Sequence, residues 1–441
     1  MQEIIDISFG VGTLAALFFY IEIIVHRHKA ILPHRWMLQA AVLLWALVLP
    51  IKFYYLDYTL ESADAVFHLM EADEIAAGIA VGDWTSAWDH LGLSNRGFQL
   101  VLGLLRSVAS PSQYFLRIAF AAIAFSGSLS LLELMVVATG AVRMPLLPVA
   151  VTLLIPSVIY WTPEVLKEAG TFWGCCMMLR LGCRNASVET KLGRWQSLVG
   201  MVVVGFLRPQ WLAMWLAAFA ATSLIISRRW IHALLFAGSL YPTWMLLQVV
   251  APNQFEKAQA DGMLSARQSQ FEIATLSVDS AGGSTLRYYF GGPIPLVTGA
   301  ALILFRPFPF EVHNFNELVS GAEVWFLSLV MLDNLRRQPK ISLFLHQPGI
   351  GFCVLLITIF CWDFTYMYNL GLAVRQRLVV IPALLLLAFV PQIIRANVTW
   401  AMLRHHQGRP DRCDPAVLRR RTPNPSGAVI SRIGRTSRVG R

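Results

Sequence analysis

Four side chains on one stretch of the chain have the types and spacing needed for proton transfer or cation binding. The segment 61–81 contains no proline and a single glycine, which predicts a helix there. At about 100° per residue, one face of this helix carries Glu61, Asp64, His68 and Glu71. Carboxylates on such a face could act as a general base for a hydroxyl group or hold a divalent cation, Mg²⁺ or Mn²⁺. The pattern is equally typical of an amphipathic helix that lies on a membrane with one wet face, and the residues alone leave both interpretations open.

Positively charged side chains recur beside prolines and expected helix ends, where they could grip a phosphate group. They are Lys167 with Glu168 after the turn 156–163, Arg208 before Pro209, Arg306 at the start of a segment running to Glu311, and Arg375 with Arg377. Guanidinium groups pair with two phosphate oxygens at once, and an ammonium group at a helix start acts together with the helix dipole. For Lys167 the alternative is an ammonium group that reaches the lipid headgroups.

The composition places these residues in a membrane protein. Of the 441 residues, 56% are hydrophobic and 14% are charged, and the mean hydropathy is +0.56. A soluble chain of this length needs more charge to cover its surface. The sequence therefore predicts an all-α, polytopic integral membrane protein.

Most of the net charge of +10 lies in the last segment of the chain. Residues 400–441 contain ten arginines and two aspartates, which gives 10 − 2 = +8. This segment is also rich in proline, glycine and serine, so it is expected to be a disordered tail. Its expected partners are the anionic lipids of the cytoplasmic leaflet rather than nucleic acid.

The hydropathy pattern divides residues 1–399, a single transmembrane domain, into about 11 spans, within a range of 10–13. A span needs about 20 mostly apolar residues. The predicted spans are 7–25, 36–55, 113–138, 144–162, 169–183, 195–207, 209–227, 230–251, 319–334, 349–367 and 378–395. The segment 289–305 is expected to be re-entrant or interfacial, because glycines and prolines interrupt it.

The positions of the basic residues set the orientation, because cations favour the cytoplasmic side. They place the N-terminus outside and the C-terminus inside. Two long external loops follow, about 56–112 and 252–317, both expected to carry juxtamembrane helices, and a short external turn is expected at 369–377. All the candidate residues above then lie at the outer face of the membrane.

Other classes of site are not indicated by the sequence. The six cysteines have no metal-ligand spacing, and most lie in or beside apolar runs. There is no phosphate-binding loop or dinucleotide fingerprint, which argues against nucleotide-driven transport by this chain alone.

Taken together, these motifs resemble the GT-C glycosyltransferases, polytopic enzymes that take sugars from polyprenyl-phosphate donors. More closely, they resemble a group of bacterial envelope proteins across about residues 55–395. The shared motifs are Asp64-Ala65 with His68, Pro156-Ser157 with Trp161 and Lys167-Glu168, Arg208-Pro209, Arg306 to Glu311, and Arg375 with Arg377. Two features depart from the GT-C pattern, since an extra span precedes the acidic loop and no C-terminal soluble domain follows.

The resemblance implies transfer of a sugar or glycan from a polyprenyl-phosphate or polyprenyl-diphosphate donor to a hydroxyl group of a glycan acceptor. The reaction would invert the sugar and belong to cell-envelope polysaccharide assembly on the periplasmic face of a bacterial inner membrane. Asp64 would be the base and His68 its assistant, on the face shared with Glu61 and Glu71. The residues expected at the donor phosphate are Lys167, Glu168, Arg208, Arg375 and Arg377, and those expected on the acceptor side are Arg306 and Glu311.

Three other interpretations remain. The departures leave room for an O-antigen or exopolysaccharide repeat-unit polymerase, with arginines in the main role. A lipid-linked glycan transporter or flippase is the alternative outside enzymes, although the inverted repeats and broken helices typical of transporters are not evident. The third alternative is an envelope assembly factor that has no catalytic activity.

Overall fold

The computed structural model describes most of the chain as helices. The described residues are 2–51, 63–109, 112–183, 191–225, 230–250, 303–309, 312, 315–337, 349–364 and 370–406. Within these ranges there is no strand. The predicted all-α class is confirmed for this part of the chain.

Five helices are long and apolar enough to cross a membrane. These spans are Ser8–Arg27, Leu32–Leu49, Phe115–Thr139, Leu318–Arg336 and Ile381–Leu403. They belong to α1 (Gln2–Arg27), α2 (Arg35–Ile51) with the 3-10 turn Leu32–His34 before it, α7 (Gln113–Thr139), α17 (Phe315–Arg336) and α21 (Ile381–His406). The protein is thus a helical membrane protein, while the count of 11 spans stays a prediction.

Other helices occupy most of the remaining predicted spans. They are α8 (Leu146–Leu154), α9 (Pro156–Trp161), α10 (Glu168–Gly182), α11 (Lys191–Leu207), α12 (Pro209–Ile225), α13 (Trp230–Val250) and α19 (Ile350–Asp363). The predicted span 144–162 is not one continuous helix. Ile155 has extended dihedrals (φ −64°, ψ 119°), because the residue before a proline disfavours the helical region and Pro156 follows.

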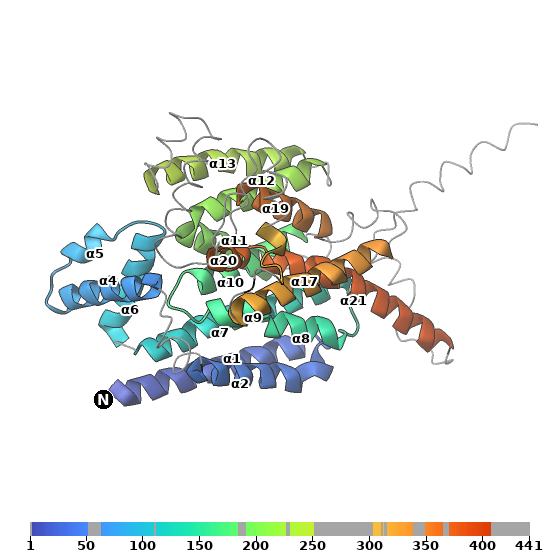
Figure 1. Cartoon of the computed structure of the whole chain (residues 1–441), viewed down its shortest axis with the longest axis horizontal. Coiled ribbons are helices and arrows are strands. Elements are labelled where there is room, and N and C mark those ends of the chain that lie inside the picture. Colours follow the sequence, from blue (N-terminus) through green and yellow to red (C-terminus); the bar gives the residue numbers. More distant parts are fainter. Residues whose placement is uncertain are drawn as a thin grey trace, which may run out of the picture.

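Residues 63–109, within the segment 56–112 that was predicted to be an external loop, form three helices. They are α4 (Ala63–Ala80), α5 (Thr85–Asp89) and α6 (Asn95–Ala109). In Figure 1 they form the left end of the molecule, the end at which α1 also begins. The second loop, 252–317, lies mostly outside the described residues.

Two boundaries differ from those expected. Residues 370–377, expected as a turn, form the helix α20 (Leu370–Arg377). The last helix continues to His406, through the first seven residues of the segment assigned to the tail, and points away from the α4–α6 end in Figure 1. Residues 407–441 lie outside the described part of the chain.

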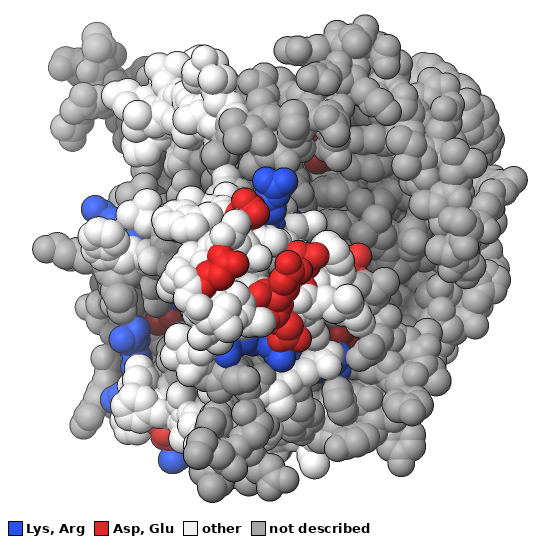
Figure 2. Space-filling view, turned by 90° about the vertical axis from the view of Figure 1, so that its left-hand side faces the viewer, with Lys and Arg blue, Asp and Glu red and all other residues white. Residues whose placement is uncertain are grey.

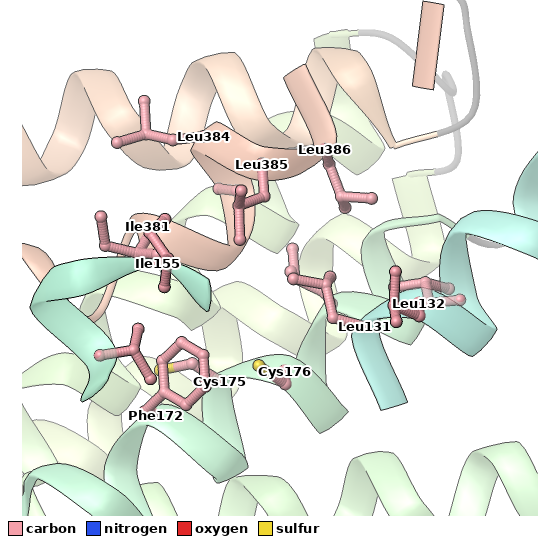
Figure 3. Close-up of a cluster of buried hydrophobic side chains, with 14 of the residues drawn as sticks. Leu131, Leu132, Ile155, Phe172, Cys175, Cys176, Ile381, Leu384, Leu385 and Leu386 are labelled. Carbon is pink, nitrogen blue, oxygen red and sulfur yellow. The ribbon is translucent and has the colours of Figure 1, made fainter. Parts of the chain in front are cut away.

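Helix α10 is the centre of the fold and packs against α7, α11 and α21. Figure 3 shows Phe172, Cys175 and Cys176 of this helix facing Leu131 of α7 and Leu385 of α21. The crossing with α11 is close enough to require glycine, because a Cβ atom on Gly174 would lie 2.7 Å from Val204 Cγ2. This packing fixes the start of α10 at the end of the molecule that carries α4–α6.

Candidate phosphate and proton-transfer site

The turn between α9 and α10 places charged side chains in the protein interior. Glu164, Lys167 and Glu168 are all 5% exposed or less. The hydroxyl of Thr171 donates to the Lys167 carbonyl at 2.7 Å, which ties the turn to the first turn of α10. Buried charges are costly unless they are paired, so the partners of these side chains define what the turn does.

Glu168 forms hydrogen bonds with two arginines from distant parts of the chain. Its Oε1 accepts a hydrogen bond from Arg208 NH2 at 2.7 Å and another from Arg375 Nε at 2.6 Å. Its other oxygen, Oε2, is buried and has no hydrogen-bond partner among the described residues. A carboxylate would repel a phosphate, so Glu168 is placed to orient the two guanidinium groups rather than to contact the anion itself.

Arg375 connects this buried carboxylate to the acidic helix. Its NH1 donates to Asp64 Oδ2 at 2.7 Å. The Arg375 side chain is 11% exposed and that of Asp64 is 61% exposed, so the pair reaches from the interior to the surface. Burial alone would lower the pKa of Arg375, but Glu168 and Asp64 outweigh it and raise that pKa.

Lys167 completes the group of cations. Its Nζ donates to Ser94 Oγ at 3.2 Å and to Asn95 Oδ1, both at the start of α6. Burial, reinforced by the nearby charge of Arg208, lowers the pKa of Lys167 to about 7. An anion close to Nζ would favour the charged form.

His68 lies beneath the same group and is 3% exposed. Its ring meets the ring of Phe98 edge-on, with 5.2 Å between centroids. Burial, together with the charge of Lys167, lowers the pKa of His68 to about 4, so the ring is neutral at physiological pH. Its Nδ1 is buried and has no hydrogen-bond partner within the described residues.

Glu71, on the same face of α4, has a different partner. Glu71 Oε2 lies 3.0 Å from His90 Nε2, so it joins α4 to the end of α5. Glu61 lies outside the described residues. Figure 2 shows that acidic side chains gather over this end of the molecule, and the exposed ones on α4 include Asp64, Asp73 and Glu74.

Arg377 is not brought to Glu168. Arg377 follows Arg375 by two residues in α20, so its side chain points to the opposite face of the helix. There it is buried and donates to the Leu304 carbonyl at 3.2 Å, and burial lowers its pKa to about 10. Its charge is near Glu323, whose two oxygens accept from the backbone N–H and the hydroxyl of Ser157 at 2.8 Å each.

The residues expected on the acceptor side are only partly described. Arg306 is buried, at 5% exposure. The next residue, Pro307, packs against Gly321 of α17 so closely that a Cβ atom on that glycine would lie 2.7 Å from the Pro307 carbonyl oxygen. Glu311 lies outside the described residues.

Sequence reasoning missed the residues that hold Lys167, namely Ser94 and Asn95. One local signal was present, because serine and asparagine are typical of helix starts. Ser94 has a positive φ of 60°, and its N–H donates to the Phe206 carbonyl at the end of α11. The structure thus fixes the start of α6 against α11.

No group of three or more histidine, cysteine, aspartate or glutamate side chains converges in the part of the chain that the structure describes. The concentrated charge at this end is instead the set Lys167, Arg208 and Arg375 around Glu168 and Asp64. Such an arrangement can bind an anion with its cations while it holds one carboxylate at the surface.

By this geometry the chain is a helical membrane protein in which a mostly buried cluster of cations lies beneath an acidic surface helix. No protein-family model, no curated protein and no solved structure matches the chain.

Proposed function

We propose that the protein is a membrane glycosyltransferase that moves a sugar or glycan from a polyprenyl-phosphate or polyprenyl-diphosphate donor to an acceptor hydroxyl group. The observation that carries this proposal is the double hydrogen bond of Glu168, which orients Arg208 and Arg375 next to Lys167 and Asp64. Anion-binding groups and a candidate base are thereby adjacent.

The cations are suited to the leaving phosphate. In the reaction the bond between the anomeric carbon and a phosphate oxygen breaks, and its electron pair leaves with the phosphate. Lys167, Arg208 and Arg375 would stabilise the charge that develops on that oxygen, and their buried surroundings strengthen the effect. Because Glu168 holds the guanidinium groups of Arg208 and Arg375, these groups need little reorganisation during the reaction.

Asp64 is suited to the acceptor. The new bond forms between the acceptor oxygen and the anomeric carbon, and Asp64 takes the proton of the attacking hydroxyl group. The carboxylate is exposed to an incoming acceptor, while Arg375 holds one of its oxygens. A donor phosphate that competes for Arg375 would release Asp64 as the base, so donor binding and base activation would be coupled.

The experiment compares two neutralised carboxylates on the same helix. Asp64→Asn keeps the size of the side chain and removes the base, so transfer should fall by about 10²- to 10⁴-fold with unchanged expression. Glu74→Gln removes an exposed carboxylate of the same helix and should leave transfer unchanged. The readout is mass spectrometry of the lipid-linked saccharides that accumulate in a deletion strain complemented with each variant.

Accumulation of the same lipid-linked intermediate in the deletion and Asp64→Asn strains, but not in the Glu74→Gln strain, is the expected result. A product lacking a single sugar indicates a glycosyltransferase, and a complete unpolymerised repeat unit indicates the polymerase instead. Wild-type behaviour of Asp64→Asn would remove the general-base role, and an unchanged deletion strain would remove the glycan-assembly function.

A further inference from the structure

An apolar cavity opens between α1, α2 and α7, away from the charged cluster. Its volume is about 130 Å³. Every residue that lines it is apolar, including Leu17 of α1, Ala46 of α2 and Ile118 of α7. In Figure 1 these three helices lie side by side at the bottom of the molecule.

The wall of the cavity is held in place by specific contacts. The indole Nε1 of Trp45 donates to the Leu153 carbonyl at 3.0 Å, which fixes the Trp45 ring. That ring meets Phe125 edge-on, with 5.4 Å between centroids. Both aromatic residues are buried, at 4% and 1% exposure, so the cavity has a rigid wall.

The lining residues share one depth in the bundle. They occupy the first half of the span Ser8–Arg27, the second half of Leu32–Leu49 and the start of Phe115–Thr139. These are the halves nearest the end where α1 begins and α4–α6 lie (Figure 1). The cavity is therefore in the half of the membrane that faces the candidate site.

We infer that this cavity binds the hydrocarbon chain of a phospholipid from that leaflet. Its mostly apolar walls offer water few hydrogen-bond partners, whereas methylene groups gain contacts with the apolar side chains. The three helices around it are membrane spans, so lipid chains are the molecules that reach its mouth. The bound chain completes the packing of α1 and α2 against α7.

The position of α7 distinguishes this lipid from a donor tail. Ile118 and Phe125 of α7 line the cavity. On the other side of the helix, Leu116 packs with Leu69 of α4 and Val165 beneath the charged cluster. Since α7 stands between the two sites, the occupant is a resident phospholipid and not the tail of a ligand held at Lys167.

The test uses a phosphatidylethanolamine with a diazirine group in its acyl chain, in vesicles that contain the purified full chain. After irradiation, mass spectrometry of peptides should find the label on wall residues such as Leu17 and Phe125. Ala46→Phe places a ring in the cavity and should reduce this labelling by roughly tenfold, because the ring takes the space of the chain. Leu43→Phe, at an exposed position of the same helix, should leave it unchanged.

Several outcomes overturn the inference. They are equal labelling of the wall in wild type and Ala46→Phe, an equal loss in Leu43→Phe, or wild-type label only on exposed positions such as Phe19 and Leu47. The wild-type map keeps the test valid even if Ala46→Phe does not fold. Loss of the wall label on addition of geranylgeranyl phosphate would assign the cavity to a donor-like tail and also overturn the inference. None of these outcomes depends on transferase activity.

Discussion

The two ends of α10 carry similar charges in different arrangements. At its start, Glu168 accepts from Arg208 and Arg375 with Oε1, while Oε2 has no partner among the described residues, and Lys167 precedes it. At its last turn, Arg180 donates to Glu133 Oε2, while His28 Nε2 lies 2.9 Å and Arg27 NH1 lies 3.3 Å from Oε1.

The difference supports the proposal that the start of α10 binds the donor phosphate. Both oxygens of Glu133 are used, and a cation in the last turn of a helix is favoured by the helix dipole. At the start of the helix the cation Lys167 opposes the dipole, and burial lowers its pKa to about 7. This arrangement is costly for the protein alone but favourable with an anion present, as the proposed phosphate site requires. The Glu133 cluster is an ordinary structural link between α1, α7 and α10.

The largest expected effects come from neutralising the two central carboxylates. Glu168→Gln and Glu133→Gln each remove a buried counter-charge from cations that are mostly shielded from water, which should lower the free energy of unfolding by roughly 3–5 kcal/mol. Thermal unfolding in detergent measures this loss. At a low temperature where both variants remain folded, Glu133→Gln should retain transfer per folded molecule and Glu168→Gln should not. Equal activity of the two folded variants would contradict the assignment of the ligand site to the start of α10.

The next effect distinguishes the geometry of the Arg375 guanidinium group from its positive charge. Arg375→Lys keeps the cation but cannot contact Glu168 and Asp64 at once, so transfer should fall by about 10²- to 10³-fold. The matched change at the other end, Arg180→Lys, should alter thermal stability and leave the rate of folded protein within about threefold. A rate loss in Arg180→Lys as large as that in Arg375→Lys would contradict the assignment of the ends.

The sequence predicted that Lys167, Arg208 and Arg375 lie at helix ends, because prolines and hydropathy are local signals. The structure brings these side chains together with Asp64, and their role in binding phosphate stays a prediction. The sequence could not show that Glu168 orients the arginines, because the contact between Glu168 and Arg375 joins residues 207 positions apart.

The expected role of Arg377 shows a second limit. The sequence predicts a turn at 369–377, in which neighbouring side chains can face the same ligand. In the helix that forms there, positions two apart point in nearly opposite directions. The pairing of Lys167 with Ser94 and Asn95 was missed for another reason, because it depends on how α6 is anchored to α11.

A smaller effect concerns pH. The donor phosphate should bind the charged form of Lys167, and the free protein loses that charge as pH rises through about 7. A bound phosphate raises the pKa of Lys167, so the affinity is constant below pH 7 and falls by up to about tenfold per pH unit above it. The KM of the donor between pH 6 and 9 measures this. Lys167→Gln should bind more weakly with a flat profile, and a wild-type profile in that variant would exclude Lys167 from the phosphate site.

The smallest effect would sharpen this assignment. Asn95→Asp preserves the shape of the side chain that accepts from Lys167 Nζ and adds a negative charge beside it. An opposite charge at this distance favours the ammonium form, so the midpoint of the pH profile should rise by about one pH unit. At pH 7 the KM should change by only a few-fold, because the added carboxylate also repels the donor phosphate. The control Asn95→Ser removes the amide without adding charge and should not raise the midpoint. A midpoint that moves equally in both variants would mean that packing at the start of α6, rather than the charge on Lys167, sets the pH dependence.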